Sequence, residues 1–171
     1  MTIEPGEQID LRRPDGSSPS AVRVELQWSP HRAGDLYAQA VMFAGDRWRD
    51  AVGFLRRRSD DGAVTQVGRD GPEDVLVSLG QVNRRVTRIA FVLLAFAGDT
   101  FDAIEYCDLW VSDLLTGDLL ALVDVGSNGP HAAMVMAAIR RRADGWALKA
   151  IGEPSTARRF EEINAAIRPH L

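Results

Sequence analysis

A long hydrophobic run lies within Arg88–Ala97, where both alternating sets of side chains are apolar. Successive side chains of a strand point to opposite faces, so a short run that is apolar on both faces predicts a strand covered on both sides. Gly98 and Asp99 follow it and favour a turn. We therefore expect this strand at the centre of the fold.

The clearest alternation of apolar and polar residues lies in Val22–Trp28. A period of two predicts a strand with one face in the core and the other in water. Leu36–Phe43 has a similar pattern, with Ala38 and Ala40 on one face, which indicates a close neighbour there. Further strands are predicted at Gln8–Arg12, Ala51–Leu55, Val64–Val67, Val75–Leu79, Leu109–Val111, Leu119–Val123, Ala132–Ile139 and Trp146–Ile151.

Two of these segments also admit a helix. Trp48, Val52 and Leu55 have helical spacing within Asp46–Leu55, and Ala132–Ile139 is rich in alanine and methionine. We prefer strands in both places, because a charged turn follows the first and the hairpin signal Asp144-Gly145 follows the second.

The C-terminal segment Thr156–Ile167 is the one convincing helix, with apolar residues recurring at helical spacing. Thr156 can cap its start and Pro169 ends it. Many short strands joined by glycine- and aspartate-rich turns, with one late helix, predict an all-β fold. We expect an antiparallel β-sandwich with a short C-terminal helix, formed by residues 1–171 as a single domain.

Composition narrows the classes of function. The net charge of −4 argues against a protein that binds nucleic acid, which would normally carry a basic excess. The start of the chain lacks a secretory signal, and the run within Arg88–Ala97 is about half the ~20 residues of a membrane-spanning helix, so no integral membrane segment is expected. The single cysteine, Cys107, fits a reducing compartment. We therefore expect a cytoplasmic protein.

Catalytic motifs are weak. No Gly-x-Ser-x-Gly elbow occurs, and the alternation around Cys107 predicts a small buried side chain rather than a reactive thiol. His31, His131 and His170 lack the spacing of a zinc site and are expected on the surface or in loops. Asp60-Asp61-Gly62 is more typical of a turn than of a ligand group.

Two arginine runs stand out, Arg56–Arg58 and Arg140–Arg142. Such runs usually form solvated faces. The functional alternative is contact with an anion or an acidic partner, because guanidinium groups bind carboxylate and phosphate in paired geometry.

Taken together and in order, several segments resemble the TerD/TerE tellurite-resistance and general stress proteins. The segments that carry the resemblance are Gly6–Leu11, Val22–Trp28, Gly34–Ala40, Ser59–Val64, Val77–Val82, Ile89–Val92 and Asp144–Gly152. The resemblance covers nearly the whole chain. It implies a β-sandwich with calcium sites built from aspartate-rich loops.

The calcium loops of the family are altered here. The Asp-x-Asp-x-Asp loop falls on Ala33–Tyr37, where only Asp35 is kept, and the Asn-Asn pair falls on Leu55-Arg56. The Asp-Gly-Asp-Asp-Glu loop falls on Arg69–Glu73, where Glu73 matches, while Asp70 and Asp74 are displaced acids nearby. Calcium takes six to eight oxygen ligands. With Asp35, Asp70 and Glu73 as the remaining metal ligands, we expect no cofactor, or at most weak calcium binding.

Arginines have appeared beside these loops, which suggests a replacement of the ion. A fixed positive charge relieves the repulsion among carboxylates as a cation does. We expect Arg56 or Arg69 to pair with Asp35, Asp70 or Glu73. The alternative is that the ligands were simply lost and the arginines point into solvent.

Three functions remain in view. The first is a non-enzymatic stress-response module of the tellurite-resistance type that acts through other stress-response proteins. The second is a hydrolytic enzyme that uses Asp35, Glu73 and Asp74 for general acid–base catalysis. The third is a calcium-dependent membrane-docking module. The missing nucleophile and base favour the first.

Overall fold

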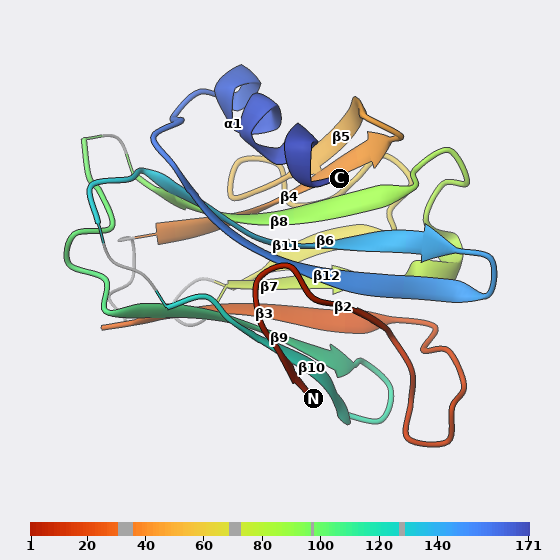
Figure 1. The fold of residues 1–171 in the computed structure, drawn as a ribbon. Coiled ribbons are helices and arrows are strands. Elements are labelled where there is room, and N and C mark those ends of the chain that lie inside the picture. The colour runs from red at the N-terminus through yellow and green to blue at the C-terminus, as the bar shows by residue number, and fades with distance from the viewer. Residues whose placement is uncertain (31–35, 69–72, 97, 127–128) are drawn as a thin grey trace.

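The computed structural model describes residues 1–30, 36–68, 73–96, 98–126 and 129–171. They form two six-stranded sheets packed face to face (Figure 1). What we call the open sheet has the spatial order β1 (Thr2–Ile3), β10 (Leu119–Asp124), β9 (Tyr106–Asp113), β3 (Val22–Ser29), β7 (Glu73–Val77) and β6 (Val64–Val67). What we call the covered sheet has the order β2 (Gln8–Asp10), β12 (Gly145–Ser155), β11 (Ala133–Arg142), β8 (Arg88–Ala95), β4 (Leu36–Ala44) and β5 (Arg47–Val52).

The pairing of strands confirms the predicted sandwich. Neighbouring strands of the described chain run antiparallel, except that β1 pairs in parallel with β10. A short 3₁₀ helix, Leu79–Gln81, follows β7. The sequence did not predict β1, because two residues are too few to show an alternating pattern.

The core lies between the two sheets, and β8 is its most buried strand. Every residue of β8 after Arg88 is buried, and Phe91 is fully inaccessible to solvent. β8 lies between β11 and β4, so its backbone is paired on both sides. The predicted central strand is therefore confirmed.

Helix α1 (Phe160–Ile167) lies on the outer face of the covered sheet (Figure 1). Ile163 and Ile167 are buried there in one cluster with Val41 and Val92. The ring of Phe160 packs edge-on against Trp48 of β5, with 5.2 Å between ring centroids. A final 3₁₀ turn, Arg168–His170, continues from the helix.

The start of the helix was predicted wrongly. The structure places it at Phe160, with Arg159 at the N-cap position, rather than at Thr156. β12 extends to Ser155, so the chain is still extended where the helix was expected. The Glu162 carboxylate accepts the backbone N–H groups of Arg158 and Arg159 and so fixes the start.

The strand predicted at Ala51–Leu55 lies earlier, at Arg47–Val52. Gly45 has φ +63°, which allows a tight turn directly after β4, and the hairpin then pairs Trp48 with Phe43. As a result Phe54 and Leu55 lie in an exposed loop, with Leu55 87% exposed.

Candidate functional site

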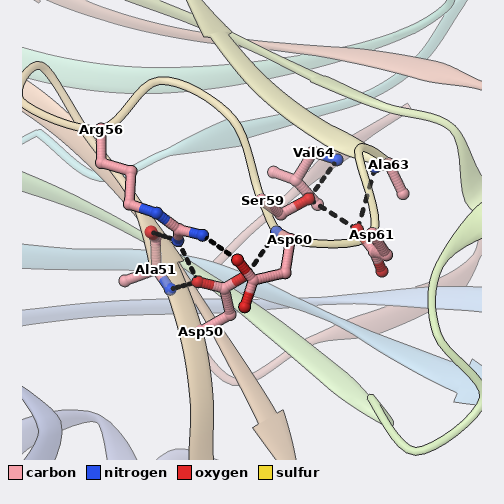
Figure 2. Close-up of polar contacts among 8 residues, drawn as sticks. All are labelled: Asp50, Ala51, Arg56, Ser59, Asp60, Asp61, Ala63 and Val64. Atoms are coloured by element: carbon pink, nitrogen blue, oxygen red, sulfur yellow. Dashed lines mark hydrogen bonds and ion pairs between the residues drawn. The ribbon is translucent and has the colours of Figure 1, made fainter.

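The loop after β5 places the Arg56 guanidinium between two carboxylates (Figure 2). Nη1 donates to Asp50 and, at 3.0 Å, to the carbonyl oxygen of Ala51, while Nη2 donates to Asp60. The backbone N–H of Asp60 also donates to Asp50, at 2.8 Å. Asp50 is the first cause of the raised pKa of Arg56, through a hydrogen bond that favours the charged guanidinium. The arginine holds the end of β5 to the following turn.

Asp61 anchors that turn from the inside. Its carboxylate accepts hydrogen bonds from the Ser59 hydroxyl at 2.6 Å and from two backbone N–H groups, of Ala63 and Asn83, at 2.9 and 2.8 Å. Burial alone would raise the pKa of Asp61, but these hydrogen bonds outweigh it and lower the pKa overall. Gly62 completes the turn with φ +71°. The predicted Asp60-Asp61-Gly62 turn is confirmed.

These carboxylates border a hollow of about 90 Å³. Its lining residues are Met42, Arg49, Asp50, Asp60, Asp61, Asn83 and Val86. Calcium would need six to eight oxygen ligands, but here a guanidinium compensates two carboxylates and the third accepts three hydrogen bonds. These residues do not fit a calcium site, and the described chain contains no group of three or more acidic, histidine or cysteine side chains that could hold a metal ion.

The structure describes two of the five residues predicted at the altered calcium loops. Asp35, Asp70 and Arg69 lie outside the described residues. Glu73 begins β7, and its carboxylate accepts a hydrogen bond from Gln66 Nε2 at 2.5 Å. Among the described residues, Arg56 pairs with the carboxylates of Asp50 and Asp60.

A second group of acids lies on the outer face of the open sheet. Glu25 of β3 stands directly opposite Asp74 of β7, and Asp108 of β9 directly opposite Asp124 of β10. Burial, followed by the charge of Glu25, raises the pKa of Asp74 to about 6. Burial and the charge of Asp124 also raise the pKa of Asp108. Like charges directly opposite destabilise a sheet, so the acids on this face repel each other.

Arg23 relieves this repulsion in part, because its guanidinium lies 3.8 Å from Asp74 and 3.9 Å from Glu25. The sequence predicted the solvent-facing side of β3. It did not predict that acids of neighbouring strands stand opposite each other on that side. Strand register decides which residues are opposite, and no local pattern carries that information.

Two other candidate reactive groups, Cys107 and His131, are buried. Burial raises the pKa of the Cys107 thiol to about 12, so the thiolate that nucleophilic chemistry requires is strongly disfavoured. His131 lies in a loop, as predicted, but it is buried rather than on the surface. Its ring lies 4.6 Å from that of Phe101, and burial lowers its pKa. His170 is partly buried, and His31 lies outside the described residues.

Comparisons with known proteins agree with this fold. Two crystal structures are similar, one of a protein of unknown function and one of a homologue of telluride resistance protein (TerD) from Streptomyces coelicolor A3(2). Their TM-scores are 0.66 and 0.63, both at 20% sequence identity. The first match covers 84% of this chain and 94% of that chain, and the second 82% and 92%. At this identity the two structures establish the fold alone.

Sequence relatives extend the comparison. The tellurium resistance protein TerZ of Serratia marcescens is 28% identical over 125 residues. That alignment covers 69% of this chain and 64% of TerZ, so the chain spans less than two thirds of this curated relative. A family model described as the TerD domain matches residues 1–164. The resemblance in the sequence is thereby confirmed, and the chain belongs to the TerD domain family.

Proposed function

We propose that this TerD domain protein is a non-enzymatic stress-response module of the tellurium-resistance type that acts by binding protein partners. The observation that carries the proposal is the outer face of the open sheet. A row of residues in register crosses four strands there, from Leu122 and Trp110 to Glu25 and Asp74. It combines apolar side chains with acids on one continuous surface.

This face suits a partner that supplies basic groups. Burial, and after it the charge of Glu25, raises the pKa of Asp74 and so disfavours its ionised form. A lysine or arginine from a partner would relieve the part that comes from repulsion. Trp110 and Leu122 are partly buried, and Tyr106 is 45% exposed. Tryptophan and tyrosine are enriched at protein interfaces, and complementary charge sets the choice of partner.

A pull-down from the native cell tests the proposal with two matched charge reversals. Glu25→Lys changes the centre of the open face, and the new lysine can pair with Asp74, so folding should be preserved. Glu161→Lys is the control, because Glu161 is exposed on α1, at the opposite side of the sandwich. We expect a protein captured by the wild type and by Glu161→Lys to be lost with Glu25→Lys. Equal capture by all three would contradict the proposal.

Running the same pull-down with calcium and again with chelator separates this function from calcium-dependent membrane docking. We expect the same partner in both conditions. In parallel, liposome sedimentation with and without calcium measures docking directly, and calcium-dependent sedimentation would favour the alternative.

The chemistry of the described side chains favours binding over catalysis. The thiol of Cys107 is buried and protonated, and the carboxylates of Asp50, Asp60 and Asp61 are engaged by Arg56 or by hydrogen bonds. A broad hydrolase and phosphatase screen should give no turnover. Turnover abolished by Asp74→Asn or Glu73→Gln would instead support the hydrolytic alternative.

We further propose that Arg56 supplies positive charge at the loops where the family resemblance implies calcium. The support is its position between Asp50 and Asp60, one residue after Leu55, where the family's first amide ligand falls. A guanidinium held by two carboxylates fixes β5 to the turn without an ion.

A further inference from the structure

Three basic side chains gather on the outer face of the covered sheet, at the end that α1 leaves uncovered. Arg88 of β8 and Arg140 of β11 are directly opposite each other in the register. Lys149 of β12 stands opposite Ala138, two residues before Arg140, which makes it a diagonal neighbour on the same face. Like charges in these positions repel, so the cluster opposes folding unless a negative charge compensates it.

No acidic side chain of the described chain lies within ion-pair distance of Arg88, Arg140 or Lys149. Two acids in or next to β2, Glu7 and Asp10, are engaged elsewhere. Glu7 accepts the backbone N–H of Glu4 at 2.7 Å, and Asp10 lies 3.8 Å from Arg142. The cluster is therefore uncompensated by the surrounding strands.

Arg88 supplies an independent observation. Its Nε–H is buried, yet it has no hydrogen-bond partner among the described residues. A buried donor without an acceptor costs free energy, and a buried guanidinium N–H costs more than a neutral one. Arg88 also lines the adjoining hollow.

The hollow itself is small and basic. It measures about 110 Å³, and its lining includes Arg88, Arg140 and Lys149 together with Gln8, His170 and Leu171. Lys149 is held in place, since its Nζ donates to the His170 carbonyl oxygen at 3.0 Å. Arg140 is exposed, so the hollow is open to exchange with solvent. Pockets for drug-sized ligands measure about 300–1,000 Å³, so this one suits a much smaller group.

We propose that Arg88, Arg140 and Lys149 form a binding site for a small oxyanion, such as a phosphate group or a tellurium oxyanion. Guanidinium groups donate paired hydrogen bonds to oxyanions, and the ammonium adds a point charge. The inference goes beyond the proposed function, because the site lies on the opposite sheet from the proposed protein-binding face. It also gives a role to Arg140, the first arginine of the run Arg140–Arg142.

The other two arginines of that run have structural roles. Arg141 donates to the backbone carbonyl oxygens of Val82, Asn83 and Val86 and stacks on Trp146, with 4.5 Å from its guanidinium carbon to the ring centroid. Arg142 lies near Asp10. Arg140 alone of the three is left for a ligand.

Calorimetric titration with inorganic phosphate, and separately with tellurite, tests the site in the whole chain. We expect at least one of the two anions to bind, with binding weakened about tenfold or more by Arg88→Gln and by Arg140→Gln. Arg23→Gln is the matched control, because it removes an equal charge from the outer face of the open sheet and should leave the affinity unchanged. The anion that binds shows whether the site takes a phosphate group or a tellurium oxyanion.

The melting temperature of each variant, measured without anion, distinguishes a loss of binding from a loss of folding. Removing one of two facing arginines should leave the melting temperature in anion-free buffer unchanged or higher, whereas a structural role predicts a fall. Absence of binding by both anions would overturn the proposal. Equal weakening in Arg23→Gln would also overturn it, since the binding would then be non-specific attraction. Either failure would leave the pull-down result on the open face unaffected.

Discussion

The two sheets have very different outer faces. On the covered sheet, β4, β8 and β11 place Val41, Val92 and Val135 outward, and α1 buries them under Ile163 and Ile167. On the open sheet, the outward positions of β3 alternate as charged or polar residues with the buried ones, and no described element lies over them (Figure 1). The covered face completes its own core, whereas the open face keeps aromatic and acidic side chains at the surface.

This difference indicates which outer face is available to bind a partner. An apolar sheet face must be covered for the domain to be stable, so the helix serves folding. The repulsion between Glu25 and Asp74 serves no folding purpose, and a cost of that kind is expected at functional sites. The open face is therefore where a partner is expected.

The largest predicted effect lies in the layer that both sheets share. Phe91 is fully buried on the inner face of β8, so Phe91→Ala should lower the free energy of unfolding by about 3–5 kcal/mol, the usual range for emptying a core aromatic site. Urea denaturation measures this directly. A loss below ~1 kcal/mol would mean that Phe91 is not in the core.

A pair of variants compares the two outer faces. Ile163→Ala should lower the free energy of unfolding by about 2–4 kcal/mol, because this side chain of α1 is 3% exposed and packs against the covered sheet. Tyr106→Ala on the open face should cost less than about 1 kcal/mol, because that side chain is 45% exposed. Similar losses in both variants would remove the distinction between the faces.

Asp74→Asn should stabilise the protein at pH 7, by about 1 kcal/mol after allowance for solvent screening. The folded pKa of about 6 exceeds the ordinary value of 3.8, so the folded state binds the proton more tightly. Stability from this group is present below about pH 4 and is lost as the pH rises through 6.

The gain in Asp74→Asn should accordingly vanish in acid. Thermal melts at pH 3.5 and pH 7 measure the change. A variant that is destabilised at pH 7, or equally stabilised at both values, would show that Asp74 is not held in an unfavourable ionised form.

The smallest effects concern Arg56. If its guanidinium takes the place of calcium, Arg56→Ala should lower the melting temperature slightly, since the pair with Asp60 is exposed. The wild type should bind no calcium more tightly than about millimolar, and neither calcium nor chelator should shift its melting temperature. Micromolar binding would defeat the replacement. If the wild type shows no calcium binding and the melting temperature is unchanged in Arg56→Ala and Arg69→Ala, simple loss of the ligands is the better account.

The elements predicted most accurately from the sequence are those whose signal is local. The double-faced run in β8 and the alternation in β3 depend only on neighbouring residues, and both are confirmed. The β5 prediction was displaced because the turn at Gly45 begins the hairpin early and overrides the periodicity of the following residues. The helix was predicted early because nothing local shows that β12 continues to Ser155.

The candidate sites depend on contacts that are distant in sequence. Arg56 was identified, but its partner Asp50 was not, because the loop that brings them together has no periodic pattern. Glu25 and Asp74 are 49 positions apart and meet only through strand register. Arg88 and Arg140 meet in the same way on the covered sheet.

Hydrogen–deuterium exchange on the captured complex tests most directly whether the open face binds the partner. The account predicts that partner binding slows backbone exchange in β3, β7 and β9, while α1 and β5 exchange as in the free protein. Protection confined to α1 and β5, with β3, β7 and β9 unchanged, would contradict it.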